Sequence, residues 1–204
     1  MKKNIITLVS YFFISTGVLL AQETPKTLLN GSLSSSQIGF MISPGFQATQ
    51  LGSDPTGYFL VKGGLVFNDK LTLGAFYGQV LDPLDQARGF ASRLDSYQAG
   101  GLIEYTLHAS NLFHFSFPIS FGVNEIEFED EGDNWNNEES KFLFIEPAAQ
   151  IEVNIHTHAR LFAGVGYRIM GGTIQQAPDL PVVENQPTFT VGLKFGLFRA
   201  NSSK

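Results

Sequence analysis

Apolar and polar residues alternate along much of this chain, and this alternation is the feature that most restricts its fold. The clearest segment runs from residue 113 to residue 124. One parity carries Phe113, Phe115, Phe117, Ile119, Phe121 and Val123, and the other carries His114, Ser116, Pro118, Ser120, Gly122 and Asn124. A period of two places successive side chains on opposite faces of a β-strand, whereas a helix needs a period of 3.6. The segment is therefore predicted to be a strand with one apolar face.

The same pattern recurs in seven other segments, which predicts eight strands in total. Residues 160–169 and 189–197 repeat it clearly, and weaker versions occupy 37–50, 58–67, 71–81, 95–107 and 142–155. Short connections at 68–70, 108–111 and 156–158 alternate with longer ones at 51–57, 82–94, 129–141 and 171–187. This alternation of short turns and long loops is typical of outer-membrane barrels. We therefore predict an all-β fold, an eight-stranded antiparallel up-and-down transmembrane β-barrel.

The first 21 residues have the pattern of an export signal, in which Lys2 and Lys3 precede the apolar run 5–20 and then Ala21. Residues 22–36 are predicted to be a flexible periplasmic leader, residues 37–198 the barrel, and residues 199–204 a periplasmic tail. Beyond the signal, no uncharged apolar run approaches the roughly 18–20 residues that a spanning helix needs. The expected location is the bacterial outer membrane.

Charge and composition exclude several classes of function. Without Lys2 and Lys3 the chain keeps 11 basic residues against 19 acidic ones, a balance that disfavours nucleic acid as a partner. The absence of cysteine excludes disulfides, thiolate metal sites and cysteine nucleophiles. No cofactor is expected.

The polar parity of the predicted strands carries glycines and isolated charges. The interior of an eight-stranded barrel is just wide enough for side chains to fill, so we predict that these charges form an ion-pair network that plugs the lumen. If the turn at 156–158 pairs residue 155 with residue 159, Glu146 lies opposite Arg168 and Glu152 lies diagonal to Arg160. A gated proton or ion path is the alternative. The predicted network comprises Lys62, Glu104, Glu146, Glu152, Arg160, Arg168 and Lys194.

The apolar parity is predicted to face lipid, with tyrosines near the strand ends at the membrane boundary. Two sets of residues do not fit this pattern. The prolines at 44, 118 and 147 interrupt predicted strands and should mark bulges. The phenylalanines at 76, 142, 144 and 162 fall on the lumen parity, so either the plug is partly aromatic or the register slips there.

Two stretches of the sequence resemble known barrels. Thr190, Gly192, Phe195 and Leu197 match the C-terminal strand signal of outer-membrane barrels, although six residues follow that strand. Residues 146–168 are similar to small OmpA/OmpX-like eight-stranded outer-membrane proteins of Gram-negative bacteria, a group without assigned activity. The resemblance extends over about residues 39–198 and implies the fold, the outer membrane and the barrel-insertion machinery as a partner.

Three groups of residues carry side chains that could support chemistry. His114 and Ser116 have the spacing of the lipid A deacylases, and Glu104 could lie across from His114, but both residues are on the lumen parity. No catalysis is expected. His156 and His158 could offer two imidazoles to a metal, yet no third ligand is in view, so a solvated turn is predicted and no metal site.

The third long connection is strongly acidic, and it is predicted to be a solvated loop. Its carboxylates and amides suit Ca²⁺, but the EF-hand spacing is absent. Cation bridging to lipopolysaccharide phosphates, or display to a partner, are the alternatives for this possible cation or partner site. The residues concerned are Glu129, Asp130, Glu131, Asp133, Glu138 and Glu139.

The leading hypothesis is therefore a monomeric outer-membrane barrel with a charge-plugged lumen and a structural or loop-mediated role, its partners being outer-membrane lipid and an unknown extracellular molecule. A soluble periplasmic β-barrel or sandwich that binds an apolar ligand is the first alternative. A lipid A-modifying barrel enzyme is the second.

Overall fold

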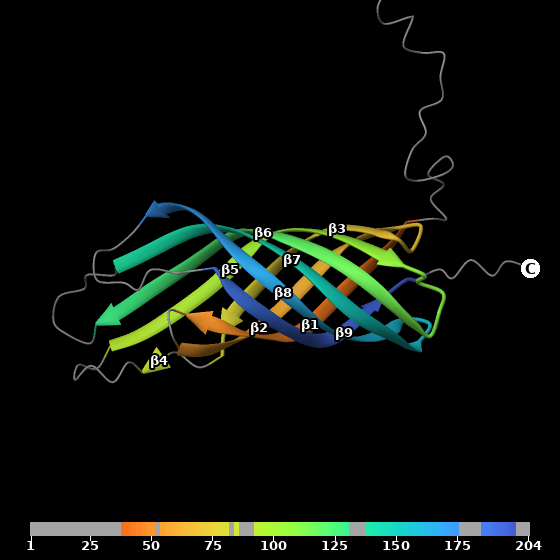
Figure 1. The fold of residues 1–204 in the computed structure, drawn as a ribbon, viewed down its shortest axis with the longest axis horizontal. Coiled ribbons are helices and arrows are strands. Elements are labelled where there is room, and N and C mark those ends of the chain that lie inside the picture. The colour runs from red at the N-terminus through yellow and green to blue at the C-terminus, as the bar shows by residue number, and fades with distance from the viewer. Residues whose placement is uncertain are drawn as a thin grey trace, which may run out of the picture. The chain divides into compact units, whose positions relative to one another are not determined.

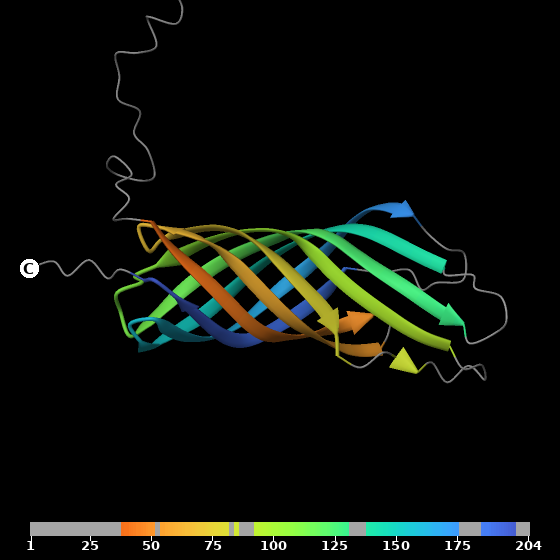
Figure 2. The same cartoon turned by 180° about the vertical axis from the view of Figure 1, so that it is seen from behind.

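The barrel wall consists of eight long antiparallel strands. In the computed structural model the described residues are 38–51, 54–81, 84–85, 92–130, 138–175 and 185–198. The wall strands are β1 (Ile38–Leu51), β2 (Asp54–Phe67), β3 (Leu71–Val80), β5 (Ser92–Leu107), β6 (Phe113–Asp130), β7 (Glu138–His156), β8 (Ala159–Gln175) and β9 (Gln186–Gly196). The two-residue β4 (Leu84–Asp85) pairs with β5, and β3 pairs directly with β5. Because β1 also pairs with β9, the sheet closes (Figure 1, Figure 2). The predicted all-β, eight-stranded antiparallel barrel is confirmed.

The predicted signal segment 1–21, leader 22–36 and tail 199–204 lie outside the described residues. Within the part of the chain that the structure describes, no helix is long and apolar enough to cross a membrane.

Tight turns join β2 to β3, β5 to β6 and β7 to β8 at one end of the barrel, here named the turn end. In the first of them, Asn68 and Asp69 have φ angles of 53° and 56°, and the amide of Lys70 donates to the carbonyl of Phe67 at 3.0 Å. Two successive positive φ angles define a type I′ turn, whose twist matches that of the flanking strands. Asn and Asp are the non-glycine residues that adopt such angles most readily.

At the opposite end, the loop end, strands β5 to β8 reach farther than β1 to β3 (Figure 1). The connection predicted at 129–141 is wrong at both of its edges, because β6 ends at Asp130 and β7 begins at Glu138. Likewise β8 continues to Gln175, inside the connection predicted at 171–187. The pairing of backbone groups continues between neighbouring strands after the apolar alternation has stopped, and only that alternation is visible in the sequence.

The prediction of bulges at Pro44, Pro118 and Pro147 is also wrong. The β1–β9 ladder is interrupted at residues 43–44, the β6–β7 ladder at 117–118 and the β7–β8 ladder at 146–147, and each resumes in the same register. A strand residue donates its amide to only one of its two neighbours, so a proline removes a bond from one ladder and leaves the other intact. The register shifts that do occur lie between β7 and β8, near the two ends of that pair.

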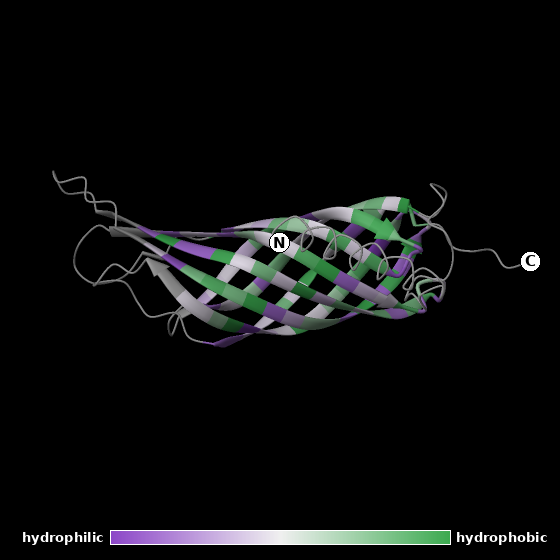
Figure 3. Cartoon of the chain, turned by 90° about the horizontal axis from the view of Figure 1, so that it is seen from above, coloured by the Kyte–Doolittle hydropathy of each residue, from purple (hydrophilic) through white to green (hydrophobic). Residues whose placement is uncertain are grey.

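The polarity of the barrel is inverted relative to that of a soluble protein. Among the described residues, 25 buried side chains are polar or charged and 11 are large and apolar. Large apolar side chains such as Phe40, Phe115 and Phe189 are more than half exposed on the outside, and hydrophobic and hydrophilic residues alternate along the strands (Figure 3). Tyr77, Tyr105 and Tyr167 lie on the outer surface as predicted. The apolar parity thus forms the outer wall.

Paired glycines allow neighbouring strands to pack closely on the inner face. Gly64 on β2 lies opposite Gly74 on β3. A Cβ atom on Gly64 would lie 2.6 Å from the carbonyl oxygen of Leu73 and 2.9 Å from the Cα of Gly74. Both contacts are with backbone, which cannot turn aside as a side chain can. Glycine is therefore required at this position for steric reasons.

Substitution of Gly64 by alanine should destabilise the barrel by about 1–3 kcal/mol, because overpacking forces the backbone to shift. Gly63 provides a matched control on the outer parity, since its nearest atom to an added Cβ is the carbonyl oxygen of Met41 at 3.7 Å. Urea unfolding of both variants, followed by far-ultraviolet circular dichroism, measures the difference. Equal midpoints for Gly64→Ala and Gly63→Ala would contradict the steric argument.

Candidate functional site in the lumen

Charged side chains in the barrel interior gather in two clusters. The first, named the turn-side cluster, comprises Glu104, His114, Glu152, Arg160 and Lys194. The second, named the central cluster, comprises Gln47, Gln98, Glu146, Arg168 and Thr188. All ten side chains are buried. The alternation predicted from the sequence places these polar groups inside the barrel, away from water. They must therefore form their hydrogen bonds with one another.

Lys194 links two carboxylates in the turn-side cluster. Its Nζ atom lies 2.6 Å from Oε1 of Glu104 and 2.5 Å from Oε1 of Glu152. The second oxygen of Glu152 lies 3.5 Å from Nη1 of Arg160, and the guanidinium of Arg160 stacks 3.8 Å from the centre of the Phe198 ring. Glu152 thus contacts two cations, and the aromatic ring covers the outer face of one of them.

His114 connects this cluster to the turn between β5 and β6. Its Nε2 atom lies 2.9 Å from Oε2 of Glu152, and its Nδ1 atom lies 3.2 Å from the carbonyl oxygen of Asn111. Both neighbours are acceptors, so both contacts can be hydrogen bonds only in the doubly protonated ring. Asn154 donates to the same carbonyl at 2.7 Å. Side chains of β6 and β7 therefore both contact this turn, through His114 and Asn154.

Arg168 and Glu146 form the centre of the second cluster. The Nε and Nη2 atoms of Arg168 lie 2.8 and 2.7 Å from Oε2 of Glu146. Gln47 donates to the other oxygen of Glu146 at 2.7 Å and accepts from Arg168 at 2.9 Å. Thr188 also donates to Glu146, at 3.2 Å. Glu146 thus receives hydrogen bonds from three side chains, and these bonds offset the cost of removing its carboxylate from water.

The strand register explains both ion pairs between β7 and β8. Asn154 lies opposite Arg160 and Ala148 lies opposite Gly166, which is the register expected here, although Ala159 itself pairs with His156 and not with residue 155, after a one-residue shift beside the turn. Glu146 is then level with Arg168, and Glu152 is one diagonal step from Arg160. Lys62 is buried on the same inner face, but it forms no ion pair with the residues that the structure describes. The seven charges therefore form two groups and a separate lysine, rather than one continuous network.

Aromatic side chains occupy part of the interior, so the residues that fill the lumen are partly aromatic. Phe76, Phe142, Phe144 and Phe162 are all buried. The Phe144 ring lies 4.4 Å from the Arg168 guanidinium carbon and 6.0 Å from the Phe76 ring. The β7–β8 register also shifts beside two of these rings, between Lys141 and Phe142 and between Phe142 and Phe144, whereas Phe76 and Phe162 lie in ladders without a shift. These rings fill space around the charges without adding polar groups that need partners.

His114, Ser116 and Glu104 do not come together as a catalytic group. Glu104 lies opposite Pro118 rather than opposite His114, and it contacts Lys194, as the predicted ion-pair network requires. Ser116 donates to Gln150 at 3.3 Å. The carboxylate beside His114 is Glu152, which the sequence pattern assigned only to an ion pair, because a contact across β6 and β7 depends on their register. The described residues contain no serine–histidine hydrogen bond of the kind that activates a nucleophile.

His156 and His158 lie in an exposed turn, with ring centres 5.5 Å apart. The hydroxyl oxygen of Thr157 lies 2.9 Å from Nδ1 of His158. Among the described residues no group of three metal-ligating side chains is found.

The acidic segment lies mainly on strands at the loop end rather than in a loop. Glu129 and Asp130 belong to β6, Glu138 and Glu139 belong to β7, and Glu127 lies opposite Glu139. Two of the predicted residues, Glu131 and Asp133, lie outside the described residues. The acidic residues therefore extend the wall of the barrel beyond its apolar band.

The C-terminal signal residues divide between the two faces of β9. Thr190 is buried in the lumen and receives a bond from Gln47 at 3.3 Å, while Phe195 and Leu197 are exposed on the outside. Gly192 lies opposite Gly45 of β1, where the barrel closes.

Comparison with known proteins gives the fold and nothing finer. No protein-family profile and no curated sequence matches the chain. The Neisserial surface protein A has a similar structure, with a TM-score of 0.56 and 12% identity over 79% of this chain and 97% of that protein. The attachment invasion locus protein Ail of Yersinia pestis, solved with the heparin analogue sucrose octasulfate, has a TM-score of 0.53 and 11% identity over 78% of this chain and 99% of that one. The chain thus has the fold of the small eight-stranded outer-membrane β-barrels.

Proposed function

We propose that this protein is a monomeric barrel of the bacterial outer membrane, that its own side chains close its lumen, and that it acts structurally or through its loop end. The observation that carries the proposal is the inverted polarity of the wall. Phe46, Phe113 and Phe115 are more than half exposed, a state that hydrocarbon favours and water does not. A closed barrel leaves no unpaired strand edge in the lipid.

The two lumen clusters and the buried phenylalanines support a closed interior. An eight-stranded barrel has room for side chains and little else. Here that room holds Glu152 with its two cations, Glu146 with Arg168, and the rings of Phe144 and Phe162. No catalytic role is proposed for these groups, since each charged group named here is engaged by a charge of the opposite sign.

The C-terminal strand supports insertion by the barrel-assembly machinery. The pattern is formed by Thr190, Gly192, Phe195 and Leu197, and its two apolar members, Phe195 near the end of β9 and Leu197 just after it, are exposed on the outside. Export by the segment 1–21 belongs to the same proposal.

The loop end is the part proposed to meet an extracellular partner. Strands β6 and β7 carry Glu127, Glu129, Asp130, Glu138 and Glu139 beyond the apolar band. Their charge would repel a polysulfate of the kind bound to the Yersinia barrel, so a basic partner or a cation-bridged one suits this surface better.

The alternative of a soluble protein that binds an apolar ligand inside is disfavoured by the same polarity. Its interior would be apolar and its exterior polar, whereas here the interior holds Arg168, Glu152 and Gln98, each at most 1% exposed.

Three measurements on the full chain test the proposal. After refolding into phospholipid vesicles, the protein should float with the vesicles and migrate differently on gels before and after boiling. In planar bilayers it should give no steady conductance above the lipid background. A protein that stays in the soluble fraction would refute membrane insertion, and a stable ohmic conductance would refute the closed lumen.

A further inference from the structure

The buried charges on the inner face of the barrel do not balance. Among the described residues the cations there are Lys62, Arg160, Arg168 and Lys194, and the carboxylates are Glu104, Glu146 and Glu152. Glu125 is buried as well, but its partner is Lys141 on the outer face. Arg160, Arg168 and Lys194 each contact a carboxylate, so the positive charge in excess is that of Lys62. A buried charge is costly unless a charge of the opposite sign accompanies it.

Lys62 is enclosed without an ion pair or a hydrogen bond to any residue that the structure describes. It is 8% exposed. Glu146 and Glu104 act on it electrostatically, but their carboxylates are engaged by Arg168 and Lys194. An ammonium group carries three donors, and the described side chains supply no acceptor for those of Lys62.

A second unpartnered donor lies beside Lys62 on the inner wall. Ser43 of β1 is directly opposite Lys62 of β2. Ser43 is 1% exposed, and its hydroxyl has no hydrogen-bond partner among the described residues. Opposite residues of neighbouring strands have Cβ atoms about 4.5–5.5 Å apart. One acceptor between the two side chains would therefore satisfy both of them.

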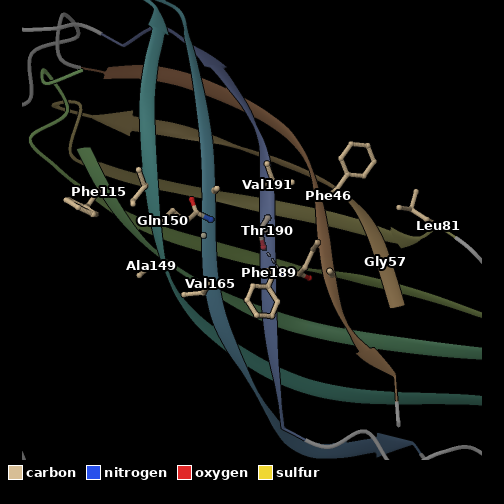
Figure 4. A pocket seen from close by; sticks show the side chains of 15 residues that line it. Phe46, Gly57, Leu81, Phe115, Ala149, Gln150, Val165, Phe189, Thr190 and Val191 are labelled. Carbon is tan, nitrogen blue, oxygen red and sulfur yellow. Dashed lines mark hydrogen bonds between the residues drawn. The ribbon is translucent and has the colours of Figure 1, made fainter. Parts of the chain in front are cut away.

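The strand on the other side of Ser43 also presents a cation to the lumen. Phe189, Thr190 and Val191 follow one another along β9 (Figure 4), and the outer two are exposed whereas Thr190 is buried. Lys194 has the parity of Thr190 and is likewise buried. The register between β1 and β9 places Lys194 level with Ser43.

These residues form a row of positive charge across four adjacent strands, here named the cation row. It consists of Lys62, Ser43 and Lys194 and ends at Arg160 of β8, which lies opposite Lys194. Lys194 and Arg160 both contact Glu152. The Lys62 end of the row has no such contact, so the local positive charge there favours an anion.

The surroundings of Lys62 select a small anion. Phe76 of β3 lies opposite Lys62 on the side away from Ser43. Toward the turn end, an apolar cluster consists of Met41, Val66 and Leu102 with Phe198 packed against them. A phosphate or a carboxylate ligand would bury several oxygens among these apolar side chains, where they would lack donors. Chloride is a single atom, and the two unpartnered donors suffice to hold it in a lumen that has little free room.

We propose that the lumen binds one chloride ion between the Lys62 ammonium and the Ser43 hydroxyl. The inference rests on the closed lumen of the proposed function, because in an open pore water would solvate Lys62. The ion balances the charge of Lys62 and accepts hydrogen bonds from both side chains. It stabilises the folded barrel and is released when the barrel unfolds.

Urea unfolding of the full-length protein in phosphatidylcholine vesicles tests this site, with sodium chloride exchanged for sodium gluconate at constant ionic strength. A ligand that binds only the folded state stabilises it by mass action, so at a fixed urea concentration the ratio of folded to unfolded protein should rise about tenfold for a tenfold rise in chloride above its dissociation constant. Lys62→Met should abolish this dependence. In gluconate alone Lys62→Met should unfold at a higher urea concentration than wild type, because the uncompensated cation is gone.

Ser43→Ala removes one donor, so it should need more chloride for the same stabilisation. Lys70→Met is the matched control, because Lys70 is exposed in the turn between β2 and β3, and it should keep the wild-type dependence. Lys62→Gln replaces Lys62→Met if the latter does not fold.

The outcomes separate this site from the proposed function. A wild type that shows no chloride dependence, or a dependence that survives in Lys62→Met, would overturn the chloride site alone if planar bilayers show no conductance. A steady conductance together with no chloride dependence would overturn both the closed lumen and the site. Failure of wild type to float with vesicles would overturn membrane insertion.

Discussion

Replacement of Glu146 by leucine should lower the free energy of unfolding of the barrel by about 3–5 kcal/mol, because it leaves the buried guanidinium of Arg168 without its carboxylate. Arg168 is 1% exposed, so water cannot take the place of the lost partner. Gln47 and Thr188, which donate to Glu146, would lose an acceptor at the same time. Urea unfolding in vesicles, followed by the loss of the folded band on unboiled gels, measures the change.

The double variant Glu146→Leu/Arg168→Met is the control for this experiment. It removes both charges, and replacement of a whole buried pair by apolar groups is often neutral or stabilising. We therefore expect the double variant to recover much of the stability lost in Glu146→Leu. A single variant that costs less than about 1 kcal/mol, the range of an exposed pair, would show that water reaches Arg168 and that the lumen is open there.

Substitution of Phe117 by arginine should destabilise the inserted barrel by about 2–4 kcal/mol, the cost of a cation at the middle of a bilayer. Phe117 lies near the middle of the outward apolar run of β6, which extends from Phe113 to Val123, and its side chain is 43% exposed. Beyond that run, Glu125 pairs with Lys141 at 3.0 Å on the loop side, which marks the polar edge of the band.

Phe113→Arg is the matched control, at the turn end of the same strand and the same face. Its side chain is 63% exposed, and near the membrane boundary an arginine should cost only about 0–1 kcal/mol. Refolding yield and urea midpoint in vesicles of one lipid composition give both values. If the two variants are equally stable, the outer face of β6 does not cross hydrocarbon.

Strands, faces and the ion pairs between β7 and β8 could be predicted because each depends on local order along the chain. A period of two is a property of neighbouring residues, and the short connection after His156, with the one-residue shift beside it, sets the register that brings Glu146 level with Arg168. The loop-end extensions could not be predicted in this way. Glutamate is depleted in β-strands, and Glu129 and Glu138 are in strands because their neighbours in β5, β6 and β7 continue to pair.

The ion pairs in the lumen also divide into those that local sequence predicts and those that only the closed barrel determines. Lys194 contacts Glu104 over a separation of 90 residues, and this contact crosses the lumen between strands that are not neighbours. Its existence depends on the closure of β1 on β9 and on the diameter of the barrel, neither of which is encoded in any short segment. The absence of an ion pair for Lys62 among the described residues has the same origin.

The sequence alone determined the number of wall strands, the inner and outer faces, and seven of the buried charges, because alternation is local and the small lumen leaves charges on the inner face no other place; Glu125, which is also buried, was not among them. Only the tertiary structure decided which charges meet and that His114 contacts Glu152. These relations link residues on different strands, and closure and register alone set the distances between them.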